Sequence, residues 1–148
     1  MRLDPLFSSD RMDWETPPDL FARYDAVNHF TLDPCATAAN AKCGRFYTVA
    51  DDGLSLPWAP ERVWMNPPYG REIGKWMAKA LGESRRGALV VCLVPSRTDT
   101  AWWHDYAMKG EIEFLRGRLR FVGAPSSAPF PSAVIIFRPA LASAAPGA

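Results

Sequence analysis

Residues 88–94 have the sequence Ala-Leu-Val-Val-Cys-Leu-Val, and this run decides the fold. It is apolar without the alternation of a half-buried strand, which indicates a strand covered on both faces, as in a parallel sheet. Pro95 follows at once and ends the strand. The run therefore predicts a central, mostly parallel sheet with helices packed against both of its faces.

On either side of this run, short apolar strands alternate with segments of helical periodicity. Thr16-Pro17-Pro18-Asp19 is typical of a helix start, with Thr16 as the cap, Pro17 in the first helical position and Asp19 as a capping-box acid. The other predicted elements are helices at 36–42, 73–81 and 100–106, strands at 30–32, 46–48, 63–65, 111–115 and 133–137, and a short extended piece between Gly117 and Gly123. This order predicts a three-layer α/β/α sandwich.

Length and composition fit one globular domain. The chain has 148 residues and a formal net charge of +1, so contact with nucleic acid would need a local cluster of positive charge. We find no secretory signal and no apolar run long enough to cross a bilayer. The three cysteines lack the spacing of a zinc site or a disulfide framework, which fits a reducing cytosol. We expect a domain at 11–138 with flexible ends at 1–10 and 139–148.

Polar residues follow several predicted strands directly: Asp33, Asp51 or Asp52, Asn66, and Ser96 after Pro95. Each of them is explained singly as an ordinary turn residue. In a parallel sheet, however, these strand ends meet at one edge, where ligands of such folds bind. The sequence therefore predicts a ligand site at this edge.

Asn66-Pro67-Pro68-Tyr69 is the segment with the clearest chemistry. An amino group on an aromatic ring is a poor nucleophile, because its lone pair is delocalised into the ring. Acceptors such as the Asn66 amide oxygen and the Pro67 carbonyl would favour a tetrahedral nitrogen and disperse its growing charge. The two prolines stiffen the loop, and Tyr69 offers a ring on which an extruded base can stack. By itself the segment predicts methylation of a planar amino group.

Five segments together extend this reasoning to a family. Residues 63–69 match the strand and NPPY motif of amino-group methyltransferases, and 14–17, 32–36, 51–54 and 129–133 narrow the match. From about Asp10 to Arg138 the chain resembles the phage-type, Dam-like DNA adenine methyltransferases. The resemblance implies a trimmed, Rossmann-like methyltransferase fold with an antiparallel C-terminal strand. It also implies methyl transfer from S-adenosylmethionine to N6 of adenine, with S-adenosylhomocysteine as product, in the cytoplasm of a bacterium that carries a phage or prophage, and a place in restriction-modification.

The resemblance also assigns residues to the cofactor, although Thr16, Trp14 and Asp33 have structural alternatives in a helix cap, a packing contact and a turn. Asp51 or Asp52 follows Asp33 at about the spacing of the acid that holds a ribose. The Gly-rich turn of larger methyltransferases is absent, so the cofactor carboxylate must be held differently. The predicted cofactor residues are Trp14, Thr16, Pro17, Asp33, Pro34, Cys35, Ala36, Asp51, Asp52 and Asn66.

Alternating arginines predict a contact with DNA phosphates: Arg116, Arg118 and Arg120, together with Arg97, Lys109 and Arg11. A solvated charged face explains any one of them equally well. Trp102, Trp103 and Tyr106 are candidates for base contacts, although we expect at least one tryptophan in the core. No residue is assigned to a metal, and a homodimer is a further expectation. The alternatives are a methyltransferase for protein glutamine amides and a non-catalytic nucleic-acid-binding relative.

Overall fold

The computed structural model describes residues 14–140, which form one six-stranded sheet in the order β2-β1-β3-β4-β6-β5. The strands are β1 (Leu32–Asp33), β2 (Arg45–Phe46), β3 (Arg62–Met65), β4 (Leu89–Pro95), β5 (Glu111–Phe114) and β6 (Ser132–Phe137). The helices are α1 (Pro18–Asn28), α2 (Ile73–Arg85), α3 (Ala101–Asp105) and the 3-10 turns η2 (Gly53–Ser55) and η3 (Ala107–Lys109). Every predicted strand except the piece between Gly117 and Gly123 is present.

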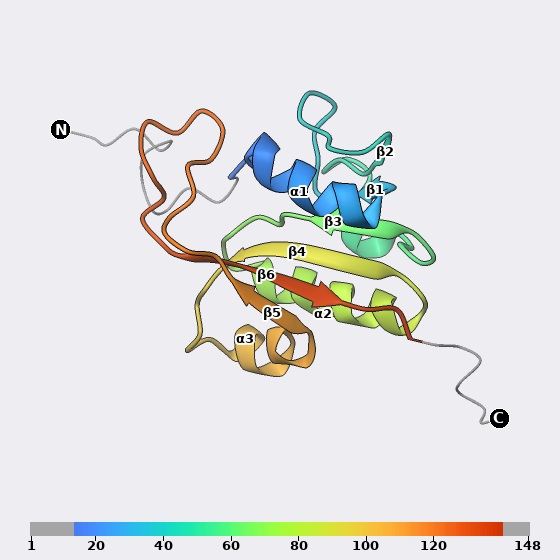
Figure 1. Ribbon diagram of the computed structural model, residues 1–148. Coiled ribbons are helices and arrows are strands. Elements are labelled where there is room, and N and C mark those ends of the chain that lie inside the picture. The colour runs from blue at the N-terminus through green and yellow to red at the C-terminus, as the bar shows by residue number, and fades with distance from the viewer. Residues whose placement is uncertain (1–13, 141–148) are drawn as a thin grey trace.

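The sheet is mixed in the predicted way. Strands β2, β1, β3 and β4 pair in parallel, whereas β6 pairs antiparallel with both β4 and β5. Figure 1 shows α1 on one face of the sheet and α2 with α3 on the other. This arrangement confirms the three-layer α/β architecture with an antiparallel C-terminal strand.

The core lies along β3, β4 and β6, whose residues are almost all buried. Trp64 in β3 is fully buried and packs against Phe21 and Tyr24 of α1. The Tyr24 hydroxyl donates a hydrogen bond to Glu113, and this bond ties α1 to the edge strand β5. The run at 88–94 supplies most of β4, which lies between β3 and β6 in the middle of the sheet, and its residues are almost all buried, as predicted.

Glu83, near the end of α2, holds the loop that leads into β3. Glu83 is 1% exposed, and its Oε1 accepts hydrogen bonds from the backbone N–H of Trp58 at 2.8 Å and of Ala59 at 2.9 Å. Its Oε2 accepts from Lys79 at 3.1 Å and from Arg86 at 2.9 Å. Burial acts to raise the pKa of Glu83, but the hydrogen bonds from Ala59, Trp58 and Lys79 outweigh it and lower the pKa to about 2.

Three predictions about local structure are wrong. Thr16 does not cap α1: the N-cap is Pro17, and it receives no side-chain bond. Residues 36–42 form turns rather than a helix, because the Asp33 carboxylate accepts from the backbone N–H of both Cys35 and Lys42 and so closes the segment into a loop.

The third error concerns residues 115–131, which contain no strand. Gly117 and Gly123 have φ of 74° and 81°, and these left-handed turns bend the chain away from an extended path. The loop leaves the end of the sheet at which β4 ends and β6 begins (Figure 1). Arg116, Arg118 and Arg120 are all exposed on it, but they do not share one face of a strand.

The termini expected to be flexible, 1–10 and most of 139–148, lie outside the described residues, as does Arg11. Ala140 still donates a backbone hydrogen bond to Ser84, so packing reaches the last described residue. Within residues 14–140 no helix combines the length and apolar character needed to cross a membrane.

Candidate active site

A cavity of about 360 Å³ opens where β1 and β3 end, at the predicted edge of the sheet. Its size is within the range of small-molecule and cofactor sites. Of the residues predicted to bind a cofactor, eight line it: Trp14, Thr16, Asp33, Pro34, Cys35, Ala36, Asp52 and Asn66. Pro67 and Pro68 line it as well, whereas Pro17 and Asp51 do not.

Asp33 organises one wall of the cavity. It is 5% exposed, and its two carboxylate oxygens accept from the N–H of Cys35 at 3.1 Å and of Lys42 at 3.0 Å. Burial raises the pKa of Asp33, and the two backbone hydrogen bonds oppose that rise. The carboxylate therefore fixes the path of 34–42 around the cavity.

The structure distinguishes the two adjacent acids. Asp51 turns its carboxylate back to Thr48, where Oδ2 accepts from the backbone N–H at 2.8 Å and from the hydroxyl at 3.1 Å. Asp52 lines the cavity and has a left-handed backbone with φ of 59°. Non-glycine residues adopt this region rarely, and such residues gather at binding sites. The inward acid is therefore Asp52.

Asn66 follows β3 directly, and its amide nitrogen donates two hydrogen bonds. Nδ2 donates to the carbonyl of Trp14 and, at 3.0 Å, to the hydroxyl of Thr16. Its oxygen, Oδ1, is buried and has no hydrogen-bond partner among residues 14–140. A buried acceptor without a partner is rare in native proteins and demands an explanation, of which an absent ligand is one.

Tyr69 occupies a different environment from the one inferred for it. Its ring is 3% exposed, lies against Phe121 and Phe130 of the 115–131 loop, and does not line the cavity. Burial raises the pKa of Tyr69 well above its ordinary value, so the hydroxyl stays protonated and donates to the Leu93 carbonyl at 3.0 Å. No face of the ring is open to a base in this conformation.

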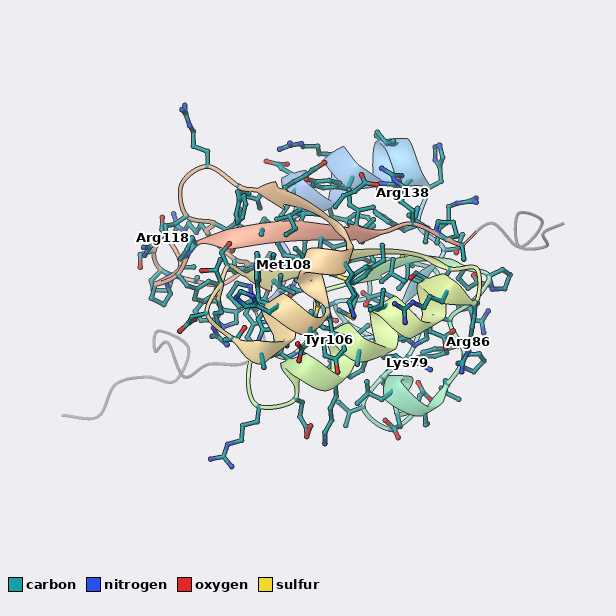
Figure 2. The ribbon with its side chains drawn as sticks, turned by 90° about the horizontal axis from the view of Figure 1, so that it is seen from below. Lys79, Arg86, Tyr106, Met108, Arg118 and Arg138 are labelled. Atoms are coloured by element: carbon teal, nitrogen blue, oxygen red, sulfur yellow. The ribbon has the colours of Figure 1, made fainter. Side chains whose placement is uncertain are left out.

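The cationic and aromatic candidates divide by location. Arg97 is half-buried and donates to the Tyr69 carbonyl at 3.2 Å, so it supports the 66–69 loop. Arg118 lies at one end of the molecule, on the 115–131 loop (Figure 2). Trp103 is 3% exposed and belongs to the core, as expected of at least one tryptophan, and Trp102 is half-buried against it.

Sequence reasoning missed about half of the cavity wall. The additional lining residues are Glu15, Thr37, Asn40, Lys42, Thr48, Val49, Gly53, Trp64 and Trp76. Gly53 is needed because a Cβ there would meet the Pro34 carbonyl at 2.6 Å. Lys42 matters most for charge, since it is the sole cation among the described residues around the cavity. The sequence around Lys42 does not predict its place at the cavity, because that place depends on the hydrogen bond from its backbone N–H to Asp33. Among residues 14–140 no group of three or more metal-binding side chains gathers.

Comparison with known proteins identifies a family. The family model described as DNA N-6-adenine-methyltransferase (Dam) matches residues 5–141. A DNA N-6-adenine-methyltransferase of Escherichia phage T1 is 25% identical over 129 residues, which cover 70% of this chain and 54% of the relative. That of Haemophilus phage HP1 (strain HP1c1) is 27% identical over 110 residues, which cover 72% and 62%. The chain thus spans between about half and three fifths of the length of these relatives.

Proposed function

We propose that this chain, which belongs to the DNA N-6-adenine-methyltransferase (Dam) family, transfers a methyl group from S-adenosylmethionine to the N6 amino group of adenine in DNA. One observation carries the proposal. The Asn66 amide has both hydrogens bound inside the protein and an oxygen without a partner among residues 14–140, beside a cofactor-sized cavity. An acceptor fixed in this way suits an N–H donor that arrives with the substrate. The phage relatives favour action on DNA in the cytoplasm of a bacterial host.

The donor set of the cavity fits S-adenosylmethionine, which combines a carboxylate, two positive centres, a ribose and an adenine ring. Lys42, with its ammonium 3.9 Å from Glu15 Oε2, would pair with the carboxylate in place of a Gly-rich turn. Asp52 would accept from the ribose hydroxyls, and Trp76 would pack against the adenine ring. The excess of acids around the cavity suits a ligand of net positive charge. When bound, S-adenosylmethionine supplies an electrophilic methyl group on sulfur.

The residues of the chain act on the amino group that accepts the methyl. Asn66 Oδ1 accepts a hydrogen bond from the adenine NH2, with the Pro67 carbonyl as a second acceptor. These bonds favour a tetrahedral nitrogen whose lone pair is free for the new N–C bond, which would form as the methyl–sulfur bond breaks. They also disperse the positive charge that grows on the nitrogen until it loses a proton to water. The loop is held in position from behind, because Arg97 donates to the Tyr69 carbonyl. Positioning therefore supplies much of the rate enhancement.

Entry of the base requires the 115–131 loop to move. Stacking of an extruded adenine on Tyr69 is blocked while Phe121 and Phe130 cover the ring. We infer that DNA displaces this loop and that its exposed arginines, Arg116, Arg118 and Arg120, contact phosphates near the extruded base. Binding should then weaken steeply as salt concentration rises.

The test is transfer of labelled methyl from S-adenosylmethionine to unmethylated DNA. We expect label in adenine-containing duplexes and none in a duplex made only of G and C. Label in a glutamine-containing protein but not in DNA would replace the proposal with amide methylation. Protein that binds the cofactor but labels no DNA would overturn it in favour of a binding module.

Asn66→Ala is the sharpest variant for this test. It removes the free acceptor, so we expect kcat to fall by roughly 10²–10³-fold, as when an oxyanion-hole donor is removed. The Kd for S-adenosylhomocysteine, measured by calorimetry, should stay close to that of the wild type. Asn28→Ala is the matched control, because Asn28 ends α1, donates to the Tyr24 carbonyl and does not line the cavity. A nearly active Asn66→Ala protein would show that this loop is not catalytic.

A further inference from the structure

The Asn66 amide lies between groups of fixed hydrogen-bond polarity. The Trp14 carbonyl can only accept, and it receives a hydrogen bond from Asn66 Nδ2. Rotating the amide by 180° would place its oxygen against that carbonyl, which is repulsive for two acceptors. The Trp14 backbone therefore opposes the rotated state, but a single contact does not hold the whole side chain.

Thr16 supplies the second constraint. Its hydroxyl oxygen accepts from Asn66 Nδ2 at 3.0 Å and from the indole Nε1 of Trp64 at 3.2 Å. An indole N–H can only donate, so one lone pair of the hydroxyl accepts on that side. The Trp14 carbonyl sets the orientation of the amide, and the second lone pair of Thr16 then accepts from Nδ2 and holds it in place. Thr16 is 3% exposed and Trp64 is 0% exposed, so water does not compete for these bonds.

Besides accepting from the Trp64 indole, the hydroxyl of Thr16 does not cap the helix that its sequence pattern predicts. The helix that follows begins at Pro18 with Pro17 as its N-cap, and no side chain caps it. Trp64 lies in β3, two residues before Asn66, so Thr16 ties the catalytic loop to a fully buried part of the same strand. The Thr16 hydroxyl oxygen thus accepts from both sides, from the Trp64 indole and from the Asn66 amide.

We propose that Thr16 is a positioning residue, which holds the Asn66 amide so that Oδ1 remains free to accept a hydrogen bond from the amino group of the substrate. This inference rests on the proposed function, in which Asn66 Oδ1 contacts that amino group. It differs from a role in holding the cofactor, because Thr16 acts through Asn66 and affects the methyl acceptor alone.

The first test compares Thr16→Val with Thr16→Ser. Valine keeps the shape but leaves the Trp64 indole and one amide hydrogen without an acceptor, whereas serine keeps the oxygen. We expect Thr16→Val to lower kcat for DNA methylation by about 10- to 100-fold, the loss expected of a displaced reacting group. The Kd for S-adenosylhomocysteine should change by less than about threefold, and Thr16→Ser should recover most of the kcat. An increase in that Kd that accounts for the lost activity would overturn the proposal in favour of a cofactor contact.

A double-mutant cycle and a measurement without catalysis complete the test. In an Asn66→Ala background, Thr16→Val should cause no further loss of kcat, because the residue through which it acts is gone. A full additional loss would contradict the proposal.

By NMR, the Asn66 side-chain amide hydrogens should exchange slowly in the wild type and in Thr16→Ser, and faster in Thr16→Val. This readout survives even if DNA proves not to be the substrate, so the two proposals fail separately. Equal exchange in all three proteins would refute the role of Thr16, as would loss of the folded spectrum in both variants.

Discussion

The two ends of the sheet differ in whether their buried polar side chains have hydrogen-bond partners. At the end where α2 finishes, the buried Glu83 carboxylate is bonded to two backbone N–H groups and two cations. Figure 2 shows Lys79, Arg86 and Arg138 toward this end and Arg118 at the other. At the carboxyl end of the parallel strands lie all the buried side-chain atoms that lack a partner among residues 14–140: Asn66 Oδ1, Ser96 Oγ and Ser132 Oγ.

The difference separates stability from function within one small domain. Unpaired buried acceptors lower the stability of the folded state, because each gives up hydrogen bonds to water. All three lie at the edge that holds the cavity, and none lies in the described part of the opposite end. Asn66 lines the cavity itself, so its position supports the proposal that a substrate completes its hydrogen bonding. The paired end, in turn, stabilises the frame on which the ligand edge is held.

The largest effect on stability should come from Glu83→Ala at the paired end. It leaves the Trp58 and Ala59 N–H groups without an acceptor, and each buried orphan costs roughly 1–3 kcal/mol. We therefore expect the free energy of unfolding to fall by about 2–4 kcal/mol in urea titration. Glu72→Ala, which breaks an exposed pair with Lys75, should cost about 0–1 kcal/mol. Equal losses in the two variants would show that the Glu83 contacts do not fasten the loop.

The same residue predicts a pH dependence. The pKa of Glu83 is lowered from its ordinary value of 4.5 to about 2 in the folded state. A lowered pKa stabilises the fold above pH 4.5, and that contribution is lost as the pH falls toward 2. Glu83→Gln should therefore flatten the fall in stability between pH 4.5 and 2. An unchanged pH profile would place the acid sensitivity of the protein elsewhere.

A smaller effect, at the ligand edge, should distinguish Asp52 from its neighbour. Asp52→Asn weakens the acceptor for the ribose hydroxyls while asparagine still tolerates the left-handed backbone, so the fold should survive. We expect the Kd for S-adenosylhomocysteine to rise about tenfold, which corresponds to about 1.4 kcal/mol. Asp51→Asn should change it by about twofold or less, since the Asp51 side chain accepts from Thr48 and does not line the cavity. Calorimetry that gave the reverse order would exchange their roles.

Asp51 and Asp52 also show how far sequence reasoning reaches. The strand at 88–94, the NPPY loop and the polar strand ends were predictable, because they depend on local periodicity and on where parallel strands end. Three features were not: which acid faces inward, the arrival of Lys42 at the cavity, and the burial of Tyr69. The first depends on the hydrogen bonds from Thr48 to Asp51 and the second on the hydrogen bond from Lys42 to Asp33. The third depends on the packing of the distant Phe121 and Phe130 on Tyr69. Thr16 is a further example, since its helix-start pattern predicts a cap, whereas its hydroxyl accepts a hydrogen bond from the Asn66 amide.

The smallest effect should come from two buried serines, one at each end of the comparison. Ser84 is 3% exposed and donates to the Leu81 carbonyl at 2.7 Å, so Ser84→Ala should cost about 0.5–1.5 kcal/mol. Ser132 is 1% exposed, and its hydroxyl has no partner among residues 14–140, so Ser132→Ala removes a desolvated group without breaking a bond. The free energy of unfolding should then stay constant or rise by up to about 1 kcal/mol. If Ser132→Ala also methylates DNA more slowly, its hydroxyl belongs to the set that the substrate satisfies. A loss of stability as large as that of Ser84→Ala would mean that Ser132 is bonded after all, and the contrast between the two ends would then rest on Asn66 and Ser96.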